Sequence, residues 1–275
     1  PARQRPKRIA KPALLVGATI AAIERHGKQL AIIGNDSASD ARGTPAGVLL
    51  VHLGMTGEVM APGPGGRLRA ADHVHVLWTL RRPDGSPAGR LAFRDPRRFG
   101  GIWTLPDRAA LDRRWSALGP DGLGVTAGDL IERIGRSARP IKAALLDQRG
   151  VAGVGNIYAD ESLFRARIHP ERLCRDLSRL QWEAVASAVR RVLTRAVELR
   201  GSTIRDYRDA SGQAGGAAAE HRVYGRAGLP CLRCGTTLAF AAVAQRTTVW
   251  CPACQERASQ ERAGQEQSSQ EPGCQ

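Results

Sequence analysis

Short runs of hydrophobic residues mark the first part of the chain, and their lengths are typical of β-strands. Four runs rich in Val, Leu and Ile are separated by clusters of Gly, Pro, Asp and Asn, which predicts strands at residues 29–33, 46–53, 73–80 and 89–94. Within the third run, His73-Val74-His75-Val76 alternates polar and apolar positions, as a half-buried strand does. Residues 1–117 are therefore expected to form a β-sheet domain.

The spacing of hydrophobic residues becomes helical after Pro106. Helices are predicted over 106–118 and 140–148, and Thr126-x-x-Asp129 is typical of a capping box that opens another helix. Ser178-x-x-Gln181 caps a long helix that ends near Gly201, and its apolar residues recur every three or four positions: Trp182, Val185, Val189, Val192 and Ala196. Residues 118–209 are therefore expected to form a helical domain.

Two stretches near the C-terminus lack this periodicity. Residues 210–219 are all Ala, Gly, Ser or Gln, which predicts a flexible linker over 210–221. From Gln255 onward the chain is dominated by Gln, Glu and Ser, so residues 257–275 are expected to be a disordered tail.

Four of the six cysteines form two C-x-x-C pairs between these stretches, at Cys231, Cys234, Cys251 and Cys254. Two such pairs at this separation can wrap one tetrahedral Zn²⁺ ion. We expect a zinc-ribbon finger over 222–256, with a hairpin that presents Arg246 at its tip. Cys174 is expected to be a buried thiol and Cys274 lies in the tail, so a reducing cytoplasm fits better than a set of disulfides.

The chain is strongly basic, with 41 Lys and Arg against 26 Asp and Glu and a net charge of +15. A polyanionic partner is expected, either nucleic acid or an anionic membrane surface; solvated arginines in a generally basic protein are the plainer explanation. No apolar run approaches the ~20 residues of a transmembrane helix, and no signal peptide opens the sequence. We therefore expect a cytoplasmic, nucleoid-associated protein with no membrane partner.

A glycine-bearing segment, Gly153-Val154-Gly155-Asn156-Ile157-Tyr158, lies between two helical stretches. Glycines let a backbone approach a partner closely, and the amides at the start of the next helix can bind phosphate. A nucleotide-binding P-loop would need a Gly-Lys-Ser/Thr ending, which the segment lacks. Taken alone, the pattern fits a helix–helix turn as well as it fits an anion site.

Five motifs together resemble the bacterial formamidopyrimidine-DNA glycosylase and endonuclease VIII family. The segment from Gly153 continues as Ala-Asp-Glu-Ser-Leu-Phe and is followed by Ile168-His169-Pro170, which is similar to the family's helix–two-turn–helix element. The other four motifs are His52-Leu-Gly-Met-Thr-Gly57, Asp95-Pro-Arg-Arg-Phe-Gly100, Val223-Tyr-Gly-Arg-x-Gly228 and Gln245-Arg-Thr-Thr248. All of these except the motif from Val223 resemble the formamidopyrimidine branch in particular. The five motifs occur in the same order as in the family.

The resemblance implies an α+β multidomain fold: an N-terminal β-sandwich, a helical helix–two-turn–helix domain and a C-terminal zinc-ribbon finger, with DNA in the cleft between. It implies a base-excision-repair glycosylase with AP lyase activity, which removes oxidised purines from damaged duplex DNA as a monomer. Such an enzyme must flip the damaged base out of the stack. Met55, Arg97 and Phe99 match the residues that fill the vacated space. Without the resemblance, core packing would be the first explanation for Met55 and Phe99, because isolated apolar residues are usually core residues.

The same resemblance assigns roles at the sugar–phosphate backbone. Lys28 matches a lysine that contacts the lesion-site phosphates and assists elimination, and Asn156 matches a phosphate contact. Arg246 matches an arginine that clamps phosphates and aids the second elimination, which suits the permanently charged, bidentate guanidinium. His73 is the second histidine of a DNA-contacting His-Asp-His pattern, of which only Asp72-His73 is present. Without the resemblance, Lys28 would be taken for an ordinary solvated charge. For Arg246 the alternative is a solvent-exposed arginine without a ligand, although a rigid arginine on a zinc ribbon in so basic a chain already indicates nucleic acid.

The sequence departs from the family at its start. The family's nucleophile is an N-terminal proline followed by glutamate, whereas this sequence begins Pro1-Ala2-Arg3, and its first acidic residue is Glu24. We expect the first strand and helix of the family to be missing, either because the true start lies upstream or because the chain is a paralogue without glycosylase chemistry. A non-catalytic protein that binds damaged or abasic DNA is thus one alternative, and a zinc-ribbon transcription or translation factor is another.

Overall fold

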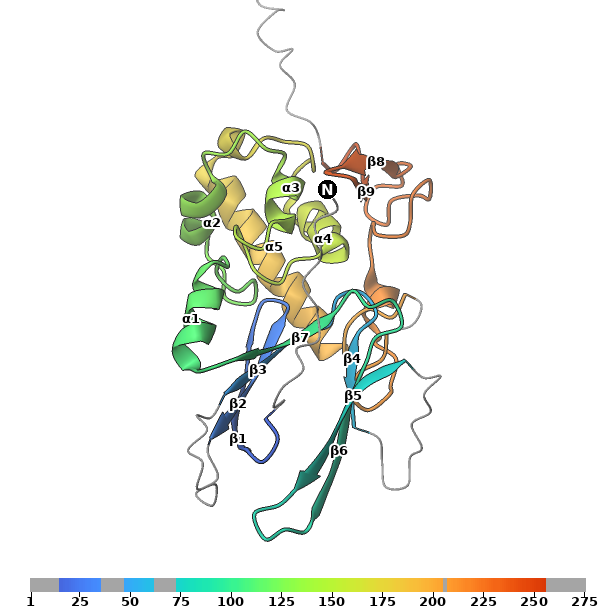
Figure 1. The fold of residues 1–275 in the computed structure, drawn as a ribbon. Coiled ribbons are helices and arrows are strands. Elements are labelled where there is room, and N and C mark those ends of the chain that lie inside the picture. Colours follow the sequence, from blue (N-terminus) through green and yellow to red (C-terminus); the bar gives the residue numbers. More distant parts are fainter. Residues whose placement is uncertain (1–14, 36–46, 62–72, 205–206, 256–275) are drawn as a thin grey trace, which may run out of the picture.

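The computed structural model describes residues 15–35, 47–61, 73–204 and 207–255. Pro1 and the segment around it, and the tail predicted at 257–275, lie outside these residues. Figure 1 shows the β-strands of the N-terminal part below a group of helices, with a small two-stranded hairpin beside the helices. Among the described helices, none is both long and apolar enough to cross a membrane.

Two antiparallel sheets form the N-terminal part. The larger has the strand order β1-β2-β3-β7 and the smaller has the order β4-β6-β5. The strands are β1 (Thr19–His26), β2 (Gln29–Asn35), β3 (Val48–His52), β4 (Glu58–Met60), β5 (Val74–Arg81), β6 (Pro87–Arg94) and β7 (Gly101–Leu105). The runs at 29–33, 46–53, 73–80 and 89–94 therefore predict β2, β3, β5 and β6 correctly, whereas β1, β4 and β7 were not predicted.

The two sheets form a sandwich because they bury a common set of side chains. Leu49 and Val51 of β3 pack in one cluster with Phe93 of β6. The alternate residues of β3, Val48 and Leu50, point to the other face and pack against α1 (Arg108–Ser116). Both faces of β3 are thus covered, which explains its unbroken apolar run.

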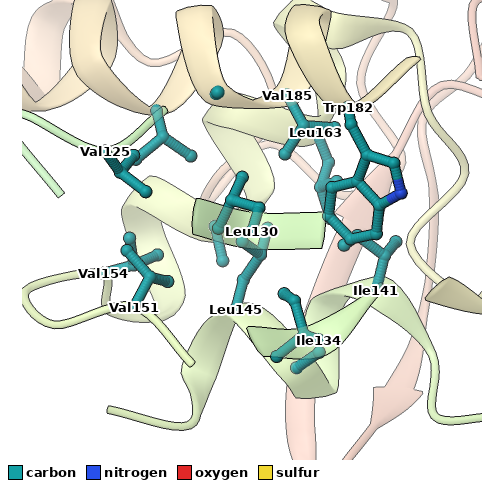
Figure 2. Close-up of a cluster of buried hydrophobic side chains, with 14 of the residues drawn as sticks. Val125, Leu130, Ile134, Ile141, Leu145, Val151, Val154, Leu163, Trp182 and Val185 are labelled. Carbon is teal, nitrogen blue, oxygen red and sulfur yellow. The ribbon is translucent and has the colours of Figure 1, made fainter. Parts of the chain in front are cut away.

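Four further helices pack around one core (Figure 2). They are α2 (Ala127–Ile134), α3 (Ile141–Leu146), α4 (Asn156–Ala166) and α5 (Arg179–Glu198). Thr126 and Ser178 form the two predicted capping boxes, with Asp129 and Gln181 respectively. The predicted stripe of α5 is buried except at Val192, which is only partly covered while its neighbour Leu193 is buried.

The four-cysteine segment forms a finger around the hairpin of β8 (Ala239–Val243) and β9 (Arg246–Trp250). Its apolar residues, among them Leu238 and Val249, share a core with Phe164 of α4, so the finger packs directly on the helical domain. The 210–221 segment differs from the predicted linker at its end. Residues 217–220 form the 3-10 helix η3 (Ala217–Glu220), and the amide of Ala217 donates to the carbonyl of Gly201 just beyond α5.

Candidate nucleic-acid interface and metal site

The tip of the β1–β2 hairpin is set into the turn before α4. Gly27 has a φ of +56°, and a side chain there would place its Cβ 2.7 Å from the Cβ of Ala152, so only glycine fits. Asp121 fixes this contact: its carboxylate accepts from the amide of Gly27 at 2.7 Å and from both terminal nitrogens of Arg25 at 2.6 and 3.0 Å. The next residue, Lys28, is thereby placed against the helical domain.

Lys28 is held in a partly desolvated position. Its Nζ donates to the carbonyl of Val154 at 2.8 Å and lies beside Gly155, the N-cap of α4. Burial, together with the nearby positive charge of Arg246, lowers the pKa of Lys28 to about 8. The ammonium is therefore mostly charged at neutral pH, yet it can release its proton far more readily than a surface lysine.

Asn156 and Arg246 approach the same place from α4 and β9. Asn156 is the first residue of α4, and its Nδ2 donates to the carbonyl of Thr247 at 3.0 Å. Arg246 is the first residue of β9 and follows a tight turn in which Ala244 and Gln245 both have positive φ. We call Lys28, Asn156 and Arg246 the basic cluster. It combines two cations with the amide-rich start of a helix, a combination that binds phosphate.

A buried ion pair holds the finger hairpin in register with α4. The Nζ of Lys142 lies 2.6 Å from Asp160 Oδ1, and both side chains are 0% exposed. Lys142 also donates to the hydroxyl of Thr248 at 2.7 Å, and Asp160 accepts from the amide of Val249 at 3.2 Å. One residue further along α4, the carboxylate of Glu161 accepts from the amides at positions 222, 223 and 224, where the finger begins. Both ends of the finger are thus tied to α4.

Met55, Arg97 and Phe99 form a second cluster, which we call the wedge cluster. The guanidinium of Arg97 lies over the ring of Phe99, 4.9 Å from its centroid. The loops that carry Met55 and Phe99 touch, since a Cβ on Gly54 would lie 2.5 Å from the backbone of Phe99 and Gly100. Met55 is 62% exposed and Phe99 is 40% exposed, which excludes the alternative that they are core residues.

Buried Asp95 shapes the wedge cluster. Its carboxylate accepts from the amide of Gly100 at 2.7 Å and from the hydroxyl of Thr56 at 2.8 Å, which ties the two loops together. His73 is exposed with a φ of +57°, and its carbonyl accepts from the amide of Asp95 at 3.1 Å. The backbone thus places His73 next to the loop of Arg97 and Phe99, while nothing described brings its side chain to theirs.

Both clusters lie at the same end of the larger sheet. In the strand register, Gln29 pairs with His52, and His52 pairs with Gly101. Lys28 directly precedes Gln29. Met55 follows His52 by three residues, and Phe99 precedes Gly101 by two. The sheet therefore presents the hairpin tip and the two wedge loops along one edge.

The four predicted zinc ligands come together. Their sulfur atoms all lie within 4.8 Å of one another, and the Sγ atoms of Cys234 and Cys251 are 3.4 Å apart. A tetrahedron with Zn–S bonds of about 2.3 Å has sulfurs about 3.8 Å apart, so the set fits one Zn²⁺ ion. Amides at Arg233 and Cys254 donate to the first sulfur of each knuckle at 3.4 Å. The cofactor is one structural Zn²⁺ ion.

Several residues that position these groups were not predicted from the sequence. These residues do not lie on the exposed surface of the basic cluster or the wedge cluster, but they fix the segments that carry the two clusters. They are Lys142, Asp160, Asp121 and Asp95. A signal existed for Lys142, which is the one charged residue of the helix sequence Ile-Lys-Ala-Ala-Leu-Leu. Asp160 gave no such signal, because Glu161 and Ser162 follow it directly. Asp121 and Asp95 lie in loops, where an acidic residue gives no such signal.

Comparisons with known proteins bear on all three parts of the chain. The family model for the formamidopyrimidine-DNA glycosylase N-terminal domain matches residues 2–102, that for its H2TH domain matches 118–208, and that for the zinc finger found in FPG and IleRS matches 228–257. The formamidopyrimidine-DNA glycosylase of Thermomicrobium roseum is 44% identical over 247 residues, covering 86% of this chain and 81% of that protein.

Solved structures show the same fold. The MutM (Fpg) protein of Thermus thermophilus superposes with a TM-score of 0.75 at 38% identity, covering 92% of this chain and 89% of that one. Lactococcus lactis Fpg in complex with DNA containing an abasic site gives a TM-score of 0.71 at 32% identity, covering 88% and 83%. A complex of the same Lactococcus lactis protein with Fapy-dG-containing DNA gives a TM-score of 0.70 at 30% identity, covering 87% of this chain and 83% of that one.

The chain combines a β-sandwich, a helical domain with a glycine-bearing turn and a zinc finger. Cationic residues lie together where these parts meet. This combination defines a DNA-binding repair protein. The three family models cover most of the chain, and the similarity to the relatives extends over it. The chain belongs to the formamidopyrimidine-DNA glycosylase family, whose members are base-excision-repair glycosylases with AP lyase activity.

Proposed function

We propose that this chain excises oxidised purines, formamidopyrimidine and 8-oxoguanine, from damaged duplex DNA and then cleaves the abasic strand by elimination. The observation that carries the proposal is the convergence of Lys28, Asn156 and Arg246, from three separate elements, next to the edge that bears the wedge cluster. The Lactococcus lactis relative binds DNA containing Fapy-dG or an abasic site, which supports the same substrates here.

The basic cluster grips the backbone around an everted nucleotide. Arg246 contributes a permanent charge and a bidentate fork, and Asn156 lies at the amide-rich start of α4, so both are suited to phosphate oxygens. Lys28 differs from Arg246 because its pKa is about 8. It stabilises the phosphate while charged and can also give up a proton to the departing group during elimination.

The wedge cluster occupies the space that the purine leaves. Met55 supplies a flexible apolar side chain, Phe99 supplies a ring that stacks on a neighbouring base, and Arg97 supplies donors for the base left without its partner. The stacking of Arg97 on Phe99 holds the guanidinium in place before DNA arrives. His73, whose carbonyl binds the amide of Asp95, contacts the DNA backbone next to these residues.

Strand cleavage requires an amine that attacks the sugar C1′ and forms a Schiff base. Borohydride trapping on a duplex that contains 8-oxoguanine tests for this amine, since reduction converts the Schiff base into a stable covalent adduct. We expect an adduct and release of the oxidised base. Tight binding to the damaged duplex with neither adduct nor base release would instead support the alternative, a protein that binds damaged or abasic DNA without catalysis.

The protein acts as a monomer in the cytoplasm, associated with the nucleoid. The net charge of +15 supports persistent association with nucleic acid. Light scattering of the protein alone and of its complex with one duplex tests the stoichiometry, and a mass of two chains per duplex would contradict it.

A further inference from the structure

A cavity of about 440 Å³ lies between α4, α5, η3 and the first cysteine knuckle. Its volume is in the range of small-molecule pockets. Part of its wall is apolar and comes from Val192 of α5, from Leu199 directly after α5 and from Leu232 of the knuckle. Tyr158 of α4 adds an aromatic side chain. The cavity is therefore able to accept a flat, largely apolar group.

The remaining wall is strongly cationic. Five arginines line it, against the two acids Glu161 and Glu220. Both acids are already engaged: Glu161 accepts from three backbone amides, and Glu220 forms a bidentate pair with Arg195 at 2.6 and 3.0 Å. Among the described residues, neither acid forms an ion pair with Arg165, Arg191 or Arg233.

Three of these arginines come from three different elements. Arg165 is on α4, Arg191 is on α5, and Arg233 is in the knuckle, where its guanidinium stacks 4.4 Å from the ring centroid of Phe164. Within the described part of the chain, neither Arg165 nor Arg191 pairs with an acid. Burial and the charges of Arg191 and Arg233 lower the pKa of Arg165, so the three cations are close enough to repel one another. An anion between them would relieve that repulsion.

The cavity is separate from the basic cluster. Tyr158, Glu161 and Arg165 line the cavity, whereas Asn156 and Asp160 contact β9. With about 3.6 residues per turn, these two sets lie on opposite sides of α4, and Arg165 is about 14 Å along the helix from Asn156. A DNA phosphate bound at the start of α4 therefore cannot also occupy the cavity.

We propose that this cavity is a second anion site that binds a small phosphate-bearing molecule of the nucleoside monophosphate class. The phosphate sits between Arg165, Arg191 and Arg233, whose planar donors match its oxygens. The base rests on the apolar wall formed with Leu199 and Leu232. A duplex backbone presents the same phosphate chemistry, but a concave site lined by four elements favours a small ligand. The proposal is independent of the glycosylase activity.

Calorimetric titration of the zinc-loaded full chain with a purine nucleoside monophosphate, and separately with inorganic phosphate, tests the site. The variant is Arg165→Ala/Arg191→Ala, and the matched control is Arg113→Ala/Arg114→Ala, which removes two exposed charges from the solvent side of α1. We expect saturable binding of the nucleotide, weaker binding of phosphate, and a loss of about tenfold or more in the cavity variant only. Zinc content and melting temperature establish that the variants are folded, and Arg191→Ala alone serves if the double variant is not.

Three results would overturn the proposal. The first is no saturable binding of either probe to the unaltered chain, and the second is equal binding to the cavity variant and the control. The third concerns the source of the phosphate: if the cavity variant weakens binding to an abasic duplex and flattens its salt dependence more than the control does, the cavity holds DNA backbone instead. Duplex binding that matches the control, together with loss of the nucleotide, supports the small-molecule site.

Discussion

Replacing Lys142 with Met isolates the contribution of the buried ion pair between α3 and α4. Methionine keeps much of the length and apolar volume of lysine but removes the ammonium. The side chain of Asp160 is 0% exposed, and it then keeps only its hydrogen bond from the amide of Val249, at 3.2 Å. The hydroxyl of Thr248 loses the hydrogen bond of 2.7 Å that Lys142 donates to it. Removing one member of a buried pair costs about 3–5 kcal/mol because the other charge remains desolvated. We expect the free energy of unfolding to fall by that amount near pH 8.

The loss should depend on pH in a defined direction. Burial raises the pKa of Asp160 to about 6, and the charge of Lys142 opposes that rise, so the pKa is higher still in the variant. A carboxyl whose pKa is higher in the folded than in the unfolded chain takes up a proton on folding. The variant should therefore recover part of its stability as the pH falls from about 8 toward about 5.

Urea unfolding followed by tryptophan fluorescence measures these differences, since Trp182 and Trp250 lie in the helical core and in β9. The control is Lys142→Met/Asp160→Asn, which removes both charges and should be more stable than Lys142→Met alone, because no buried charge is left unpaired. A loss below about 1 kcal/mol at pH 8, or a double variant no more stable than the single one, would show that the pair does not contribute as the geometry indicates.

Four further substitutions test the zinc site and the two clusters. Cys254→Ser should lower the zinc content measured by mass spectrometry toward zero and abolish binding to abasic DNA, because metal binding and folding of the finger are coupled; retained zinc and affinity would contradict this. Affinity for an abasic duplex should fall as the pH rises from about 7 to about 9, where Lys28 loses its charge, and this fall should disappear in Lys28→Met. Arg246→Ala should move the fall to higher pH, since the charge of Arg246 contributes to lowering the pKa of Lys28; an unchanged profile would exclude that coupling. Phe99→Ala should weaken binding to the abasic duplex about ten- to hundredfold in a gel-shift titration, the range of one lost base–aromatic stack, while a change below twofold would argue against stacking.

The zinc finger and most of the helices could be predicted from the sequence because their determinants are local. The two C-x-x-C pairs name all four ligands, and the capping residues Thr126 and Ser178 begin helices where expected. Strand β1 was missed for a physical reason. It is an edge strand in which Ile20 and Ile23 are exposed, so no buried face imposes a regular alternation on its sequence.

The arrangement of the candidate site could be predicted only in part. The resemblance indicated which residues belong to it, and the structure places Lys28, Asn156 and Arg246 close together. Their roles stay predictions. Sequence reasoning did not find Lys142 and Asp160, which are eighteen positions apart and meet only because α3 and α4 pack side by side. The depressed pKa of Lys28 likewise arises from burial against Val154, a contact that no local pattern encodes.

The glycine at the tip of the β1–β2 hairpin makes the two halves of the molecule mechanically dependent. Because the backbone of Gly27 touches Ala152 with no room for a methyl group, any separation of the sandwich from the helices must carry Lys28 away from Val154. The environment of Lys28 thus depends on the contact between Gly27 and Ala152. Its ammonium is desolvated when the sandwich and the helical domain are in contact, and it is hydrated when they separate. A nitrogen-15 label on that single side chain would let magnetic resonance follow the opening of this contact directly.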